Sequence, residues 1–181
     1  LAEIAITLGV LDEAIVLLER CLALAPNFTI AQANYATALA RSQKFDEALQ
    51  KTQALQEEQP TNLSHKVQHA AILAMAGRFE GAHLKFEEVL EHIPDNAKVL
   101  TSYGHALRYG GRGEDAAIAY QKAIKAEPSA GEAYWSLANL KTFRFDNTQI
   151  TSMRREYAAM EKLGPDRYHL AFALGKALED S

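Results

Sequence analysis

The 181-residue sequence contains a single cysteine, Cys21, so it has no internal disulfide and fits a reducing compartment. It also lacks any apolar run near the ~18 residues that a membrane-spanning helix requires. The segment from Leu1 to Arg20 does not resemble a signal peptide, because acidic residues interrupt it and no basic leader precedes it. The net charge of −4 argues against nucleic acid as a partner. We therefore expect a cytoplasmic protein that engages neither membrane nor nucleic acid.

Proline is scarce, yet four of the five prolines recur at a constant spacing along the sequence: Pro26, Pro60, Pro94 and Pro128. Small residues keep the same step in two further series, which are Ala14, Ala48, Ala82 and Ala116, and Ala2, Ala36, Ala70, Gly104 and Ala138. Two small-residue positions in each period indicate two closely packed helices. The sequence therefore predicts a repeated helix pair, with a proline after the second helix of each pair.

A short turn separates the two helices of each predicted pair. Glycine ends the first helix in three of the four turns, at Gly9, Gly77 and Gly111, and an acidic residue favours the start of the second helix in all four. Each helix would have about 13 residues and a length of roughly 20 Å. The recurrent core positions of these helices are Leu39, Leu73, Leu107, Leu18, Phe86, Tyr120, Cys21, Leu55, Val89 and Ala123, with Thr52 as the polar exception.

This pattern of small, apolar and aromatic positions with a closing proline resembles the tetratricopeptide repeat, whose period is about 34 residues. The resemblance implies an all-α fold, a right-handed α-α superhelix (solenoid) of antiparallel helix pairs. We assign residues 1–181 to one solenoid domain, a fragment of a longer protein. Its expected units are 1–28 (partial), 29–62, 63–96, 97–130, 131–167 (divergent) and 168–181 (partial).

The regular spacing fails after Ala130. A first helix is expected over Gly131–Thr142, followed by a lengthened turn at 143–147. Asn147 or Thr148 would cap a second helix that continues to about Lys162. A further helix is expected from Asp166.

Two segments of this divergent part carry a narrower resemblance: GEAYWSLANLKTFRF (131–145) and DRYHLAFALGKALED (166–180). They are similar to the last repeats before the catalytic domain of bacterial tetratricopeptide-containing sulfotransferases. In that family the catalytic domain binds the sulfate donor PAPS through its own phosphate-binding loop. None of those catalytic elements occurs in this sequence. The resemblance implies that the chain is the recruiting arm of such an enzyme.

Two motifs suggest other chemistry but fit the repeat better. Residues 111–116 match the glycine fingerprint G-x-G-x-x-A, yet they join two predicted helices, whereas that motif needs a preceding strand. His65 and His69 share a helix face, but a metal site needs further ligands at matching spacing. We therefore predict no catalytic, cofactor-binding or metal-binding residues.

The resemblance places the binding surface on the first helices of the pairs, which line a concave groove. The predicted groove residues are Asn34, Thr37, Arg41, Gln68, Lys98, Thr101, Ser102, His105, Arg108, Tyr109, Trp135 and Asn139. A polar series within the groove, Asn34, Gln68, Ser102 and Ser136, keeps the same step as the prolines. Its side chains either bind the backbone of an extended ligand or satisfy neighbouring turns and water, and the sequence favours neither.

Cations and aromatic residues on neighbouring helices of the groove predict an acidic peptide or protein ligand. The leading function is thus a non-enzymatic protein-interaction scaffold, and its ligand could also be the C-terminal domain of its own parent protein. The alternatives are an arm of a glycosyltransferase-type enzyme and a stand-alone adaptor or assembly protein, for which a homo-oligomer is left open.

Overall fold

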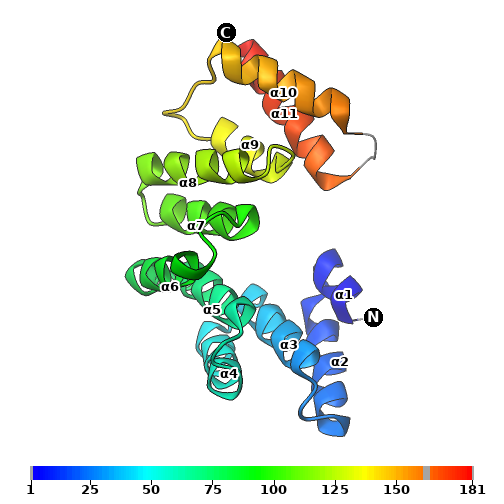
Figure 1. The fold of residues 1–181 in the computed structure, drawn as a ribbon. Coiled ribbons are helices and arrows are strands. Elements are labelled where there is room, and N and C mark those ends of the chain that lie inside the picture. Colours follow the sequence, from blue (N-terminus) through cyan, green and yellow to red (C-terminus); the bar gives the residue numbers. More distant parts are fainter. Residues whose placement is uncertain (1, 161–163, 181) are drawn as a thin grey trace. The chain divides into compact units, whose positions relative to one another are not determined.

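The computed structural model describes residues 2–160 and 164–180, and within these ranges every regular element is an α-helix (Figure 1). The helices form two compact units, Leu1–Val89 and Leu90–Ser181. The helices of the first unit are α1 (Ala2–Leu8), α2 (Leu11–Leu24), α3 (Thr29–Arg41), α4 (Phe45–Glu58), α5 (Leu63–Met75) and the greater part of α6 (Phe79–His92). Those of the second unit are α7 (Ala97–Tyr109), α8 (Gly113–Ala126), α9 (Gly131–Ala138), α10 (Asn147–Ala159) and α11 (Pro165–Glu179).

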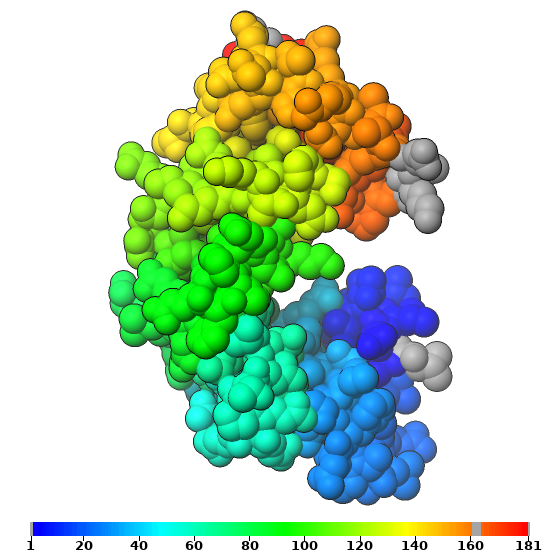
Figure 2. All heavy atoms as spheres, in the orientation of Figure 1, coloured from blue at the N-terminus to red at the C-terminus, as the bar shows by residue number. Residues whose placement is uncertain are grey.

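Neighbouring helices pack against each other along the chain within each unit. In unit 1, α1 packs on α2, α3 on α4, and the second helix of each of these pairs also meets the first helix of the next. In unit 2, α7 packs on α8, and α8 packs on α9. The space-filling view shows the atoms of this part of the chain in contact with one another (Figure 2). The helices α3 to α8 have 13 or 14 residues, as the period of the sequence predicts.

The turns inside the pairs depend on one residue with left-handed backbone geometry. Gly9, Gly77 and Gly111 have φ values of 78°, 75° and 79°. At Gly77 the chain forms a Schellman motif, in which the Gly77 N–H bonds to the Ala74 carbonyl and the Arg78 N–H to the Leu73 carbonyl. The remaining turn, between α3 and α4, has the same pattern of hydrogen bonds, and Gln43 takes the left-handed position there with a φ of 63°. The glycine prediction is therefore confirmed, and Gln43 is an exception to it.

The prolines of the periodic series lie immediately outside the second helices. Pro26 and Pro60 each stand two positions after the last helical residue, Leu24 and Glu58. Because proline has no N–H and a fixed φ, it prevents further winding at this point. The next helix then begins after a short bend, and the Asn62 side chain caps the start of α5 by accepting from the Ser64 N–H.

The small-residue series lies where the helices pack most closely. All four alanines of the first series are fully buried, and Ala36 and Ala70 of the second series are buried as completely. At Gly104 a Cβ atom would come within 2.4 Å of the Tyr120 ring, so α7 needs a residue without a side chain there. Cys21 is half-buried and packs against the core of unit 1.

The divergent repeat differs from the sequence prediction in its helix ends. The helix expected over Gly131–Thr142 ends at Ala138, where the Asn139 side chain donates to the Trp135 carbonyl. The chain then leaves the helix and buries Leu140. Phe143 and Phe145, which stack edge to face, pack against the same α7/α8 core as Leu140. This packing explains the early helix end, because a continuous helix would turn these side chains away from that core.

The start of α10 also differs by one residue. Asp146 is the N-cap, and it forms a capping box with Gln149, so Asn147 is the first helical residue rather than the cap. Ile150, which stands one repeat step after Ala116, and Met153 are both buried. The described part of α10 ends at Ala159, and the expected end near Lys162 lies outside the described residues.

Candidate partner-binding site

The predicted groove residues of unit 1 are bonded to neighbouring helices. The Gln68 amide on α5 donates to the Ala33 carbonyl at 2.6 Å and to the Thr37 hydroxyl at 2.9 Å on α3. Asn34 donates to the Glu3 carboxylate at 3.0 Å, and Arg41 donates to the Ile6 carbonyl. These side chains therefore tie α1, α3 and α5 together, which favours the structural interpretation of the polar series in this unit.

The polar residues of unit 2 are bonded as well, two of them within their own helix. The Ser102 hydroxyl donates to the Lys98 carbonyl, one helical turn earlier. Thr101 is 5% exposed and donates to the Ala97 carbonyl, so a ligand on the surface would meet little of it. Ser136 is fully buried, with its hydroxyl 2.9 Å from His105 Nε2.

His105 is half-buried and contacts two buried side chains, Ser136 and Tyr120. Its ring meets the buried Tyr120 ring edge to face, with centroids 5.6 Å apart. Burial lowers the pKa of His105, and the Arg108 charge lowers this pKa further, while Glu132 opposes the shift. The imidazole is therefore neutral at pH 7. It therefore adds no positive charge to the groove.

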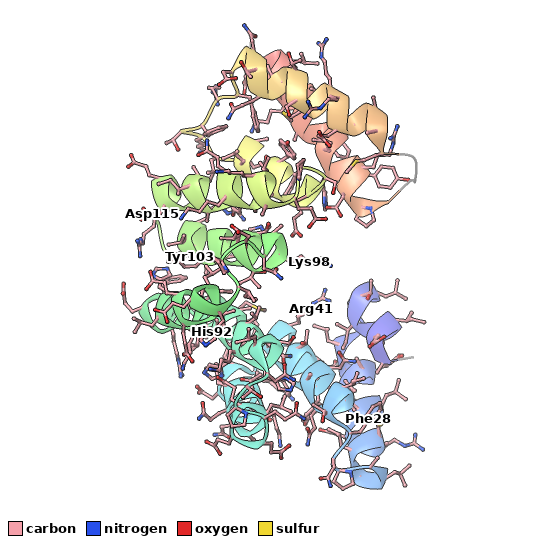
Figure 3. The ribbon with its side chains drawn as sticks, in the orientation of Figure 1. Phe28, Arg41, His92, Lys98, Tyr103 and Asp115 are labelled. Atoms are coloured by element: carbon pink, nitrogen blue, oxygen red, sulfur yellow. The ribbon has the colours of Figure 1, made fainter. Side chains whose placement is uncertain are left out.

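Five predicted residues of unit 2 have accessible side chains: Lys98, Arg108, Tyr109, Trp135 and Asn139. We call the first four of them the α7/α9 cluster. Lys98 and Tyr109 are exposed, the latter by 60%, and the Arg108 guanidinium lies 5.1 Å from the centre of the Tyr109 ring. Trp135 is 39% exposed and stacks on His169 of α11, with centroids 5.7 Å apart. Figure 3 shows Lys98 at one end of the α7/α8 pair and Asp115 at the other. The cluster combines two cations with two large aromatic surfaces.

The structure adds a pocket that the sequence did not reveal. It has a volume of about 430 Å³ and lies between α9 and α11. Trp135 and Asn139 line it from α9, Phe172, Gly175, Lys176 and Glu179 line it from α11, and Asp180 follows α11. Phe172 is 70% exposed, although Leu170, Ala173 and Ala177 of the same helix are buried. The spacing of apolar residues indicates which of them share a helix face, but not which of them the neighbouring helix leaves uncovered.

The glycine fingerprint and the histidine pair noted in the sequence both have structural roles in the repeat. Gly111 lies in the turn between α7 and α8, Gly113 begins α8, and Ala116 of α8 is fully buried. His65 lies 3.3 Å from the Gln59 side chain and His69 lies 2.7 Å from the Thr52 hydroxyl, so the two histidines have different partners. In the described part of the chain, no group of three or more histidine, cysteine or acidic side chains is placed to hold a metal ion. Nor is any described helix long and apolar enough to cross a membrane.

Comparison with known families now identifies the repeat. Two sequence models of the tetratricopeptide repeat family match the chain. One matches residues 5–68, and the other matches residues 69–126 and 102–140. The chain belongs to the tetratricopeptide repeat family. No curated protein matches the sequence closely enough to count as a relative.

Solved structures show the same fold. A tetratricopeptide repeat protein from Parabacteroides merdae is 14% identical, with a TM-score of 0.74 over 98% of this chain and 68% of its own. A thermophilic protein of the family from Thermus thermophilus is 20% identical, with a TM-score of 0.69 over 98% and 95%. MamA from Desulfovibrio magneticus is 17% identical, with a TM-score of 0.60 over 98% and 89%. At these identities the likeness concerns the fold alone, and it confirms the predicted all-α arrangement of helix pairs.

Proposed function

We propose that this chain is a non-catalytic interaction module that binds an acidic peptide segment of a partner protein through the α7/α9 cluster. Repeats of stacked helix pairs present extended binding surfaces, which supports the general role. The observation that carries the specific proposal is the Arg108 guanidinium over the exposed Tyr109 ring, on the same unit as Lys98 and Trp135. Cations beside exposed aromatic rings are typical of residues that dominate binding energy.

The local charge supports an acidic ligand, although the whole chain has a net charge of −4. Lys98 and Arg108 supply two positive charges against one acid, Glu132, on the neighbouring helix. The Debye length is about 8 Å at physiological ionic strength, so a bound peptide meets these nearby charges more than the net charge of the chain. Arginine also binds a carboxylate through two parallel hydrogen bonds, which adds directional preference to the attraction.

The wider biological role is part of the same proposal. The segments 131–145 and 166–180 support a recruiting arm N-terminal to a sulfotransferase domain, with the partner segment presented to that domain in the cytoplasm. In a stand-alone adaptor the same cluster would bind the same class of ligand. The peptide-binding proposal is therefore tested on this chain directly, without the enzyme.

The test begins with short random peptides displayed on phage and selected on the purified protein. We expect the selected peptides to be enriched in aspartate and glutamate. Calorimetry then compares a selected peptide with its analogue in which the acids are replaced by asparagine and glutamine. We expect about tenfold weaker binding for the analogue, since two charge-assisted contacts are lost.

Substitutions in the protein locate the surface. Arg108→Ala combined with Trp135→Ala should lower the affinity by about tenfold or more, because both side chains supply exposed contact area. Lys98→Ala should also weaken binding, and Lys122→Ala, which removes an exposed lysine of α8, is its charge-matched control. Equal affinity for the acidic and the neutralised peptide would refute the charge argument, and unchanged binding by the double variant would place the site elsewhere.

A further inference from the structure

The pocket between α9 and α11 is bordered by two exposed aromatic rings. Trp135 of α9 is 39% exposed and Phe172 of α11 is 70% exposed. Asn139 and Lys176 also line the pocket, together with two acids, Glu179 and Asp180, and Asp180 lies 3.5 Å from the Arg144 guanidinium. Trp135 belongs to the α7/α9 cluster as well, which makes the pocket continuous with that cluster.

The absence of a side chain at Gly175 leaves space in the pocket. This residue lies inside α11, where glycine is less favourable for the helix than alanine. No atom lies within 4 Å of the place where a Cβ would stand, so the packing of the protein does not require glycine there. Gly104 and Gly131 differ in this respect, since a Cβ would clash with the Tyr120 ring at the first and with the Asp166 backbone at the second. A side chain at Gly175 would instead occupy the space of the pocket.

We infer that this pocket holds one large apolar side chain, of leucine or phenylalanine size, from the acidic peptide segment. The inference rests on the proposed function and names a second feature of the same ligand. An aromatic-lined pocket that is open to solvent gains by burying such a side chain. A stable contact with a second copy of the chain would need roughly 800 Å² on each partner, far more than one pocket for a single side chain provides.

The experiment repeats the phage selection on Gly175→Leu, whose new side chain fills the pocket. Peptides selected on the unchanged protein should carry a leucine, isoleucine, methionine or aromatic residue at one position beside the acids. Selection on Gly175→Leu should retain the acids and lose this apolar preference. In calorimetry, replacing the apolar residue of the peptide by alanine should weaken binding about tenfold or more to the unchanged protein, and have little effect with Gly175→Leu.

A smaller substitution separates binding from folding. Gly175→Ala should raise the melting temperature by about 2–4 °C, because alanine favours the helix, and should still weaken peptide binding. Gly113→Ala is the matched control, since a Cβ at Gly113 also meets open space and Gly113 lies outside the pocket. It should leave peptide binding unchanged.

The outcomes distinguish the two proposals. Acid-enriched peptides without an apolar preference, or with one that persists on Gly175→Leu, would overturn the pocket assignment and leave the proposed function standing. Peptides with an apolar preference but no acids would overturn the charge argument of the proposed function and retain the pocket. If light scattering shows a dimer that Gly175→Leu dissociates, while no peptide is selected, the occupant is a second copy of the chain and the peptide assignment is wrong.

Discussion

Gln43 occupies a backbone position that glycine occupies in the three equivalent turns. Its φ of 63° lies in the left-handed region, where a Cβ approaches the following carbonyl oxygen. The Schellman hydrogen bonds of the turn, from Gln43 to Ala40 and from Lys44 to Leu39, hold the residue in this geometry. The turn therefore stores backbone strain that the turns at Gly9, Gly77 and Gly111 avoid.

Replacing Gln43 by glycine should stabilise the protein. Relief of the left-handed geometry is worth about 1–2 kcal/mol, and the greater freedom of glycine in the unfolded chain offsets about 0.4–1 kcal/mol of it. We expect a net gain of about 0.5–1 kcal/mol in the free energy of unfolding, measured by urea denaturation. Gly77→Gln is the reverse control and should destabilise the protein by a similar amount. A loss of stability in Gln43→Gly would show that the glutamine side chain has a contact worth more than the strain.

Single residues also show which features the sequence predicts and which it does not. The repeat step predicted that position 104 is small, and the Tyr120 ring against it explains why. The same step placed Asn34, Gln68, Ser102 and Ser136 on equivalent faces but left their partners open. Those partners include atoms of a neighbouring helix far away in the sequence, such as the Thr37 hydroxyl for Gln68 and the His105 ring for Ser136. Such contacts depend on how closely the helices approach, which a local pattern does not contain.

Among the helices, the approach of α11 to α9 is the feature that shapes the candidate site. Gly131, the first residue of α9, lies so close to α11 that a Cβ would stand 1.9 Å from the Asp166 carbonyl oxygen. The Asp166 side chain also accepts a hydrogen bond from the Glu132 N–H. This contact holds the starts of the two helices together, and it brings His169 onto Trp135.

Gly131→Ala should separate the two helices. The added methyl group meets backbone atoms, which cannot move aside without moving α11, and overpacking of this kind costs about 1–3 kcal/mol. Trp135 is the only tryptophan of the chain, so its fluorescence reports directly on the loss of the His169 stack. We expect a shifted emission maximum and faster hydrogen exchange of α11 amides, whereas Gly113→Ala should change neither. An unshifted emission with full stability would mean that α11 does not need this contact.

The regular helices were predictable because each boundary has a local cause. A glycine or Gln43 ends the first helix of a pair, and a proline follows the second. The end of α9 at Ala138 was not predictable in this way, since it follows from the burial of Leu140, Phe143 and Phe145 against α7 and α8. The α9/α11 pocket was missed for a related reason. The exposure of Phe172 depends on which neighbouring helices cover α11, and no spacing rule states this.

At the scale of the whole molecule, each unit has its own core. Unit 1 is built around a cluster that includes Ile15, Leu39 and Ile72, and unit 2 around clusters that include Leu107 and Leu170. The α7/α9 cluster and the α9/α11 pocket both lie entirely in unit 2. The predicted groove residues of unit 1 are engaged in bonds between its own helices. The two proposals therefore assign ligand binding to the second unit.

A fragment of residues 79–181 should consequently fold and bind the selected acidic peptide. Repeat arrays owe their stability mainly to contacts between neighbouring units, so shortening the array removes few of the contacts inside unit 2. Starting at Phe79 keeps all of α6, whose Leu90 packs against the cluster of Ala97, Leu100 and Ala123. We expect a helical circular dichroism spectrum and an affinity within about threefold of the full chain, which is a difference below about 0.7 kcal/mol. A folded fragment that binds at least about tenfold more weakly would show that side chains of unit 1, with Arg41 the first to substitute, contribute to the ligand site.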